Sequence, residues 1–290
     1  MNKLFHVSPG PHVRGLLTTG SVMYEVMLAL LPAVLFGISR FGAHALLMLI
    51  TAMATAVLGE HALNCFVGRE PTYRDGSAAL TGLLLGMTLP ATAPLYVPFT
   101  GALFAVLLVK GIPGGLGKNL LNPALGARCI LSVVFQPQMA AGASGTSLAC
   151  SDLLRALIAH PNGIIGCSSL ALLLGGLFLI AVRGISWHIP VTVLAGFALF
   201  SVILGGGPAP VLTQMAGGKV LAAFFMAVDP VTSPVSHAGK LIYGALIGLL
   251  AAVGQKFVGP MEAAALAVLL GNLATPLLDK RLVPKPCTLR

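Results

Sequence analysis

A short proline motif occurs twice in this chain, each time where an apolar segment is interrupted. The first copy, Pro-x-Thr-x-Pro, spans 90–94 and precedes the apolar run 101–108. The second spans 230–234 and precedes the run 244–250. Closely spaced prolines end or kink a helix, because proline has no backbone N–H to donate. Duplicated halves with broken apolar segments at matching positions are typical of membrane proteins that hold a substrate or cofactor between two repeats.

The rest of the chain is too apolar for a water-soluble domain. Of its 290 residues, 57% are hydrophobic and 9% are charged, whereas a soluble domain carries roughly 25% charged residues. The net charge is +9, but the basic residues stand singly in short loops, as expected when positive loops stay in the cytoplasm. The sequence has no basic stripe interleaved with aromatic residues, so we expect a lipid bilayer as partner and no nucleic acid.

Apolar segments that could cross a bilayer follow one another along the whole chain. A span takes about 20 residues. We expect ten spans, at about 22–38, 43–66, 77–89, 95–110, 119–135, 164–182, 187–204, 211–228, 240–257 and 261–278. Most loop lysines and arginines, Lys110 among them, then lie on the cytoplasmic side, which places both termini in the cytoplasm.

This topology divides the chain into two halves and three connecting or terminal parts. They are a cytoplasmic N-terminal segment (1–21), a first five-span repeat (22–135), an outer, periplasmic connection (136–163), a second five-span repeat (164–278) and a cytoplasmic tail (279–290). Because five is odd, the second repeat enters the membrane inverted. The expected fold class is an all-α multi-pass membrane protein with inverted repeats and broken helices. Backbone groups freed at the breaks need partners, so both breaks are candidate sites.

The sequence shows no catalytic or metal-binding pattern. Its five cysteines form no C-x-x-C pair, and no Ser/His/Asp triad, paired carboxylates or metal-ligand cluster is visible. Any redox chemistry would therefore belong to a bound cofactor, which the protein positions.

Five stretches of the sequence form a distinctive combination: 75–90 (DGSAALTGLLLGMTLP), 110–127 (KGIPGGLGKNLLNPALGA), 187–191 (WHIPV), 223–234 (AFFMAVDPVTSP) and 270–281 (LGNLATPLLDKR). Together they resemble the NqrB/RnfD family, and within it the D subunits of Rnf (Rsx) complexes, over nearly the whole chain. The resemblance implies one subunit, inactive alone, of a bacterial inner-membrane oxidoreductase. Such complexes move electrons between ferredoxin and NAD while they translocate Na⁺ or H⁺.

The same resemblance implies bound flavin. In this family the D subunit carries FMN through a phosphoester bond to a threonine hydroxyl on the outer face, and electrons would reach it from a neighbouring FMN-carrying subunit. The NqrB relatives also hold a non-covalent riboflavin, and such a site could extend to the D subunits.

The acceptor motif of the family, S-x-A-T, is matched imperfectly by 142–149 (GASGTSLA). Aligning Ser144 with the family's serine places small Gly145 next, Thr146 at the alanine position and Ser147 at the acceptor position. Either Ser147 accepts the FMN, or the register slips by one residue and Thr146 accepts it, or attachment has been lost.

Polar residues in the last span of the first half and at the second break are further candidates. Asn119 and Asn122 lie in a glycine-rich stretch that could hold a flavin ring or its ribityl chain, or could form only a tight turn. Asp229, close to Thr232, could bind a second flavin, cap a half-helix or contact a coupling cation. Arg128 could balance a flavin phosphate or pair with an acid, since a lone charge in hydrocarbon is costly.

Acidic residues at the ends of spans have simpler explanations as well. Glu60 and His61 could belong to a proton path or could mark the membrane interface, and Glu25 and Glu262 begin spans, where the helix dipole favours a carboxylate.

Two alternative functions come from other classes of protein. Duplicated five-span halves also occur in small-solute channels, whose broken segments would line a pore. A structural membrane anchor for redox partners would need no such pore. Neither alternative requires a flavin, so a bound flavin separates the expected electron carrier from both.

Overall fold

The computed structural model describes residues 18–68, 75–115, 117–140, 164–166, 168–205, 214–215 and 217–282. These residues are helical apart from turns, loops and an isolated bridge between Pro90 and Ile164, and no strand occurs among them. The expectation of an all-α chain is therefore confirmed.

The helices follow the predicted apolar segments closely. In the first half they are α1 (Thr19–Phe41), α2 (Ala43–Val67), α3 (Ser77–Thr88), α4 (Tyr96–Leu103) continued by the π-helix η2 (Phe104–Gly111), α5 (Pro123–Val134) and the short α6 (Gln136–Ala140). In the second half they are α8 (Ser169–Ala181), α9 (His188–Ile203), α11 (Gly218–Leu221) continued by the π-helix η4 (Ala222–Met226), α12 (His237–Gly254) and α13 (Pro260–Leu282).

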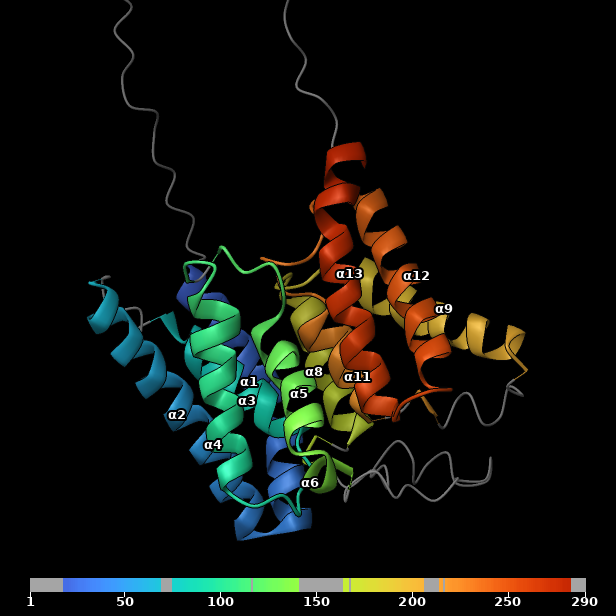
Figure 1. Cartoon of the computed structure of the whole chain (residues 1–290). Coiled ribbons are helices and arrows are strands. Elements are labelled where there is room, and N and C mark those ends of the chain that lie inside the picture. The colour runs from blue at the N-terminus through green and yellow to red at the C-terminus, as the bar shows by residue number, and fades with distance from the viewer. Residues whose placement is uncertain are drawn as a thin grey trace, which may run out of the picture.

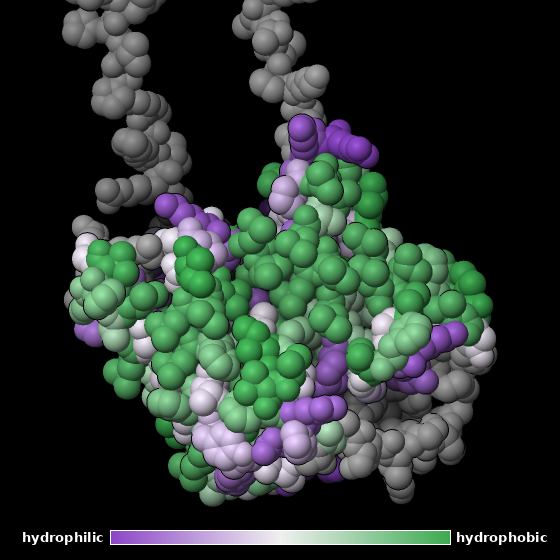
Figure 2. All heavy atoms as spheres, in the orientation of Figure 1, coloured by the Kyte–Doolittle hydropathy of each residue, from purple (hydrophilic) through white to green (hydrophobic). Residues whose placement is uncertain are grey.

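Several of these helices could cross a membrane. In the part of the chain that the structure describes, α1, α2, α12 and α13 are long and apolar enough to span it, and α3, α4 with η2, α5, α8 and α9 are shorter apolar helices. Apolar side chains cover most of the flank seen in Figure 2, and hydrophilic ones gather at the end of α13, whose last turn holds Lys280 and Arg281. A multi-pass membrane protein is the arrangement that these features support.

Most helices pack against others of the same half, and the two halves meet along two pairs of helices. In the first half α2 packs on α3 and α4, and in the second α12 packs on α9 and α13. Figure 1 shows α1 to α4 on one side, α9, α12 and α13 on the other, and α5, α8 and α11 between them. The contacts between halves are chiefly those of α1 with α8 and of α5 with α13.

Small residues let the helices approach closely at their crossings. Gly248 of α12 lies against the backbone of α9, where an added Cβ would be 2.5 Å from the backbone N of Phe197 and 2.8 Å from the Val193 carbonyl oxygen. Helix association in membranes depends on such close backbone packing, because lipid provides no hydrophobic drive between helices.

Candidate functional site

The first proline break is closed by contacts from three other segments. The Thr88 carbonyl, at the end of α3, accepts a hydrogen bond from Arg128 Nη1 of α5. The Met87 carbonyl accepts from the backbone N–H of Gly166 at 2.8 Å, and the Leu89 carbonyl accepts from that of Ile165 at 3.2 Å. His44 Nε2 of α2 lies 2.9 Å from the Ala93 carbonyl oxygen. The backbone oxygens freed at this break therefore have partners within the protein, as a break at membrane depth requires.

The second break is held in a similar way by α5 and α13. Asn122 Nδ2 donates to the Met226 carbonyl, at the end of η4, over 3.1 Å. Thr275 Oγ1 of α13 donates to the Thr232 carbonyl over 2.9 Å. The Asp229 carboxylate accepts from the backbone N–H two residues further on, at 3.2 Å, which is a local turn contact of the kind that aspartate often makes. Helix α5 and its N-cap thus reach both breaks, through Arg128 and Asn122.

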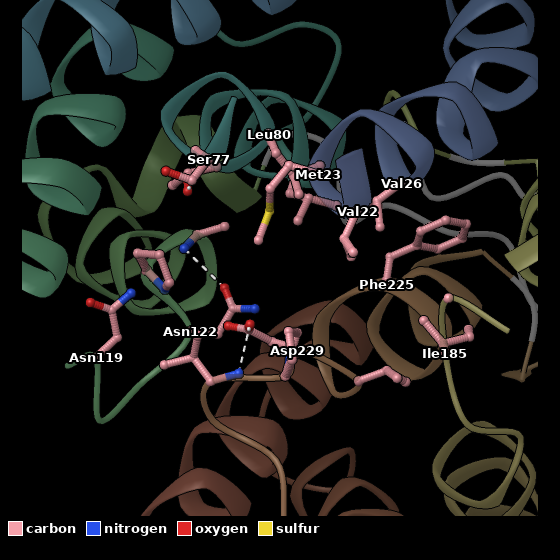
Figure 3. A pocket seen from close by; sticks show the side chains of 18 of the residues that line it. Val22, Met23, Val26, Ser77, Leu80, Asn119, Asn122, Ile185, Phe225 and Asp229 are labelled. Carbon is pink, nitrogen blue, oxygen red and sulfur yellow. Dashed lines mark hydrogen bonds between the residues drawn. The ribbon is translucent and has the colours of Figure 1, made fainter. Parts of the chain in front are cut away.

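A pocket lies beside the second break, between the two halves. It encloses about 760 Å³, its open mouth included, and is lined by parts of α1, α3, η2, η4, the loop before α5 and the turn after α8. Figure 3 shows apolar side chains of α1 and α3 along one side and Asn119, Asn122 and Asp229 along the other, with Phe225 at one end. Apolar side chains with a few polar groups among them are the usual lining of a small-molecule or cofactor site.

The two asparagines of the pocket differ in how their polar atoms are used. Asn122 caps α5, because its Oδ1 accepts from the backbone N of Ala124 at 3.0 Å, and its amide nitrogen holds the second break. Asn119 is buried, yet its Oδ1 has no hydrogen-bond partner among the described residues. A buried acceptor without a partner is costly, so Asn119 offers a contact to a ligand in the pocket.

The opposite wall carries a buried ion pair. Lys110 Nζ, near the end of η2, lies 2.7 Å from Glu60 Oε2 of α2 and donates to Ser77 Oγ over 2.8 Å. Lys110 is 2% exposed, and both Lys110 and Ser77 line the pocket. The prediction that Lys110 lies in a loop was therefore wrong, because it belongs to η2 and is buried. An ammonium in apolar surroundings takes a counter-ion, and this one is supplied by a helix fifty residues away in the sequence.

Arg128 also has an acidic partner. Its Nη2 lies 2.7 Å from Glu262 Oε1, in the first turn of α13, and its side chain is 2% exposed. Arg128 was expected either to balance a flavin phosphate or to pair with an acid, and its contacts show the pairing. The residue does not line the pocket. The ion pair joins the two halves of the molecule.

The predicted site residues thus fall into three groups. Asn119, Asn122 and Asp229 line one pocket. Arg128 and the buried Thr232 lie outside its lining, at the breaks. The candidate flavin acceptors Ser147 and Thr146 lie outside the described residues, as do Ser144 and Gly145 of the same motif. Sequence reasoning missed Ser77, Lys110 and Phe225, although a lysine at the end of an apolar run was a signal that could have found one of them.

Comparisons with known proteins agree over nearly the whole chain. The NQR2, RnfD, RnfE family matches residues 6–288. The D subunit of a Na(+)-translocating ferredoxin:NAD(+) oxidoreductase complex from Acetobacterium woodii is 36% identical over 306 residues, which cover 97% of this chain and 94% of that protein. The D subunit of a proton-translocating ferredoxin:NAD(+) oxidoreductase complex from Clostridium ljungdahlii is 36% identical over 311 residues, covering 96% and 94%. The D subunit of an ion-translocating oxidoreductase complex from Shewanella amazonensis is 34% identical over 338 residues, covering 97% of each chain.

Proposed function

Because this chain belongs to the NQR2, RnfD, RnfE family, we propose that it is the D subunit of an ion-translocating ferredoxin:NAD⁺ oxidoreductase complex. The near-complete coverage of its relatives supports this assignment. The chain acts as one membrane subunit of the enzyme and depends on the other subunits for activity. Relatives at the same identity are named for Na⁺ and for protons, so the proposal includes either cation.

The fold proposed for the membrane is ten spans in two inverted five-helix repeats. In support, each half holds one broken helix, α3 or α11 with η4, at corresponding copies of the proline motif. The first helices of the two halves, α1 and α8, pack on each other, as do the last, α5 and α13. An even number of spans leaves both termini on the same side of the membrane, which we propose is the cytoplasm. In agreement with an even number, α1 begins on the side of the molecule where α13 ends (Figure 1).

The electron carrier in this subunit is flavin. We assign covalent FMN to Ser147 or Thr146, in the outer connection, and expect it to receive electrons from a neighbouring FMN-carrying subunit. A bound flavin supplies the electron transfer, and the protein holds it and excludes water.

The pocket is the observation that carries the proposal of a second, non-covalent flavin. Its apolar wall suits an aromatic ring system, and the unpartnered Asn119 Oδ1 suits a hydroxyl of a ribityl chain. Asn122 and Asp229 lie on the same side of the pocket (Figure 3). The chemistry of these lining residues therefore matches that of riboflavin, an aromatic ring system with a hydroxylated chain.

The covalent flavin is tested by fluorescence of the denatured protein in a gel. With its flavin transferase co-expressed, the wild-type band is expected to fluoresce, and the signal is expected to vanish in either Ser147→Ala or Thr146→Ala, because only one hydroxyl carries the phosphate. Ser151→Ala, outside the motif, is the matched control and keeps its signal. A dark wild-type band, with no flavin released on denaturation, would remove the electron-carrier function and leave the channel or the anchor.

The pocket is tested by riboflavin binding to the full chain produced without the transferase. Asn119→Ala is expected to weaken binding about tenfold, the cost of one hydrogen bond to a buried group, as measured by quenching of riboflavin fluorescence. Asn64→Ala is the control, because Asn64 is also buried but lies in α2 outside the pocket. Equal affinities for wild type and Asn119→Ala would place riboflavin elsewhere.

A further inference from the structure

The pocket beside the second break has charge of both signs in its lining. Among the described lining residues, Lys110 is the one cation and Asp229 the one acid. Lys110 belongs to η2 and Asp229 to the break after η4, so the two charges come from different halves of the chain. A bound molecule would lie in the field of both.

The counter-ion of Lys110 lies outside the pocket. Glu60 does not belong to the lining, but its Oε2 is 2.7 Å from Lys110 Nζ. Both side chains are nearly excluded from water, with exposures of 2% and 7%. The ammonium of a lining residue is therefore paired with a carboxylate outside the lining, and Ser77 Oγ, which accepts from it at 2.8 Å, fixes its position.

Charges in such dry surroundings act strongly over a few ångströms, because little water screens them. A redox cofactor gains negative charge when it takes up more electrons than protons, and nearby protein charges tune that change. Uptake of two electrons and one proton by a bound flavin adds one net negative charge. A cation in the lining of the pocket favours the reduced form of the flavin. A carboxylate that pairs with this cation weakens its effect.

We propose that Lys110 and Glu60 together set the reduction potential of the electron carrier in this pocket. Lys110 raises the potential, and Glu60, by pairing with Lys110, lowers it. The inference rests on the proposed second flavin and adds two residues that the sequence did not assign to a flavin site. Neither residue takes part in the chemistry; both act on the carrier through their electric field.

The test is a spectroelectrochemical titration of riboflavin bound to the full chain, produced without its flavin transferase. Electrons come from the electrode through a mediator and the proton from the buffer, so the titration measures the proposed change directly. Lys110→Met is expected to weaken binding of reduced relative to oxidised riboflavin about tenfold, which lowers the potential by about 30 mV for a two-electron couple. Glu60→Gln is expected to shift it in the opposite direction by a similar factor.

Opposite signs for the two variants are the decisive result, because damage to the pocket would shift both in the same direction or abolish binding. Lys110→Arg keeps the cation and is expected to stay close to wild type. Lys219→Met removes another buried lysine, outside this pocket, and is expected to leave the potential unchanged. The double variant, Lys110→Met with Glu60→Gln, removes both charges, so it avoids an unpaired buried ion and is expected near the wild-type potential.

Two results would contradict the proposal, and they differ. Bound riboflavin with an unchanged potential in Lys110→Met and Glu60→Gln would overturn the role of the ion pair and leave the flavin site intact. Wild-type protein that binds no riboflavin would overturn the site itself, and the inference with it. If Lys110→Met does not fold, the sign of the shift in Glu60→Gln still decides, since a lower potential in that variant contradicts the proposal.

Discussion

Arg128→Leu is expected to destabilise the folded protein by about 1–3 kcal/mol, the cost of leaving hydrogen-bond acceptors without their partner, here the buried Thr88 carbonyl and the partly buried Glu262 carboxylate. Its guanidinium lies 2.7 Å from Glu262 and also holds the Thr88 carbonyl at the first break. Leucine can replace neither contact. The loss is measured as a lower midpoint of thermal unfolding in detergent and a smaller monodisperse fraction after extraction.

The design that isolates the ion pair uses a second change. Arg128→Leu with Glu262→Leu removes both charges and should recover much of the stability, because apolar residues can replace a buried pair without an unpaired ion. Arg40→Leu, at the exposed end of α1, is the control for losing an arginine. A double variant no more stable than Arg128→Leu would show that the contact to Thr88, and not the pair, is what matters.

Gly248→Ala is the second change with a large expected effect. The new Cβ would lie 2.5 Å from the backbone N of Phe197 and 2.8 Å from the Val193 carbonyl oxygen, both in α9. Backbone atoms cannot rotate away as a side chain can, so α9 and α12 must separate. We expect a loss of about 2–3 kcal/mol, the upper part of the range for overpacking, measured as a lower unfolding midpoint.

Another glycine of α12 provides the matched control. At Gly254 the nearest atom to an added Cβ is 3.4 Å away, on Ala263, which is ordinary contact distance. Gly254→Ala should therefore be neutral or slightly stabilising, because alanine favours a helix more than glycine does. Similar unfolding midpoints for the two variants would show that the crossing of α9 and α12 tolerates separation.

The positions of the helices could be predicted from the sequence, because apolar runs and prolines are local signals. The proline motif marked the breaks that follow α3 and η4, whereas Asn119 and Asn122, which the sequence placed in a span beginning at 119, precede the first residue of α5. The π-helical stretches η2 and η4 carry no such signal, since they depend on how neighbouring helices pack. The predicted flavin attachment at Ser147 or Thr146 stays a prediction.

Partners distant in the sequence could not be read from it. Lys110 looked like a loop cation because the sequence does not reveal that Glu60 of α2 lies beside it. Arg128 had two possible roles for the same reason, and its acid, Glu262, belongs to the other half of the chain. A charged side chain in an apolar interior needs a partner because an unpaired charge there is costly. Which residue becomes that partner depends on the fold.

The position of α5 means that the two breaks cannot behave as separate hinges. Asn122 and Arg128 hold the ends of η4 and α3, and six residues of helix separate them by about 9 Å. A helix this short is stiff, so a shift of one broken end carries the other with it unless one of these two bonds is released. Helix α5 therefore couples the two breaks, and we expect a rearrangement at the pocket to be transmitted to the first break through this helix.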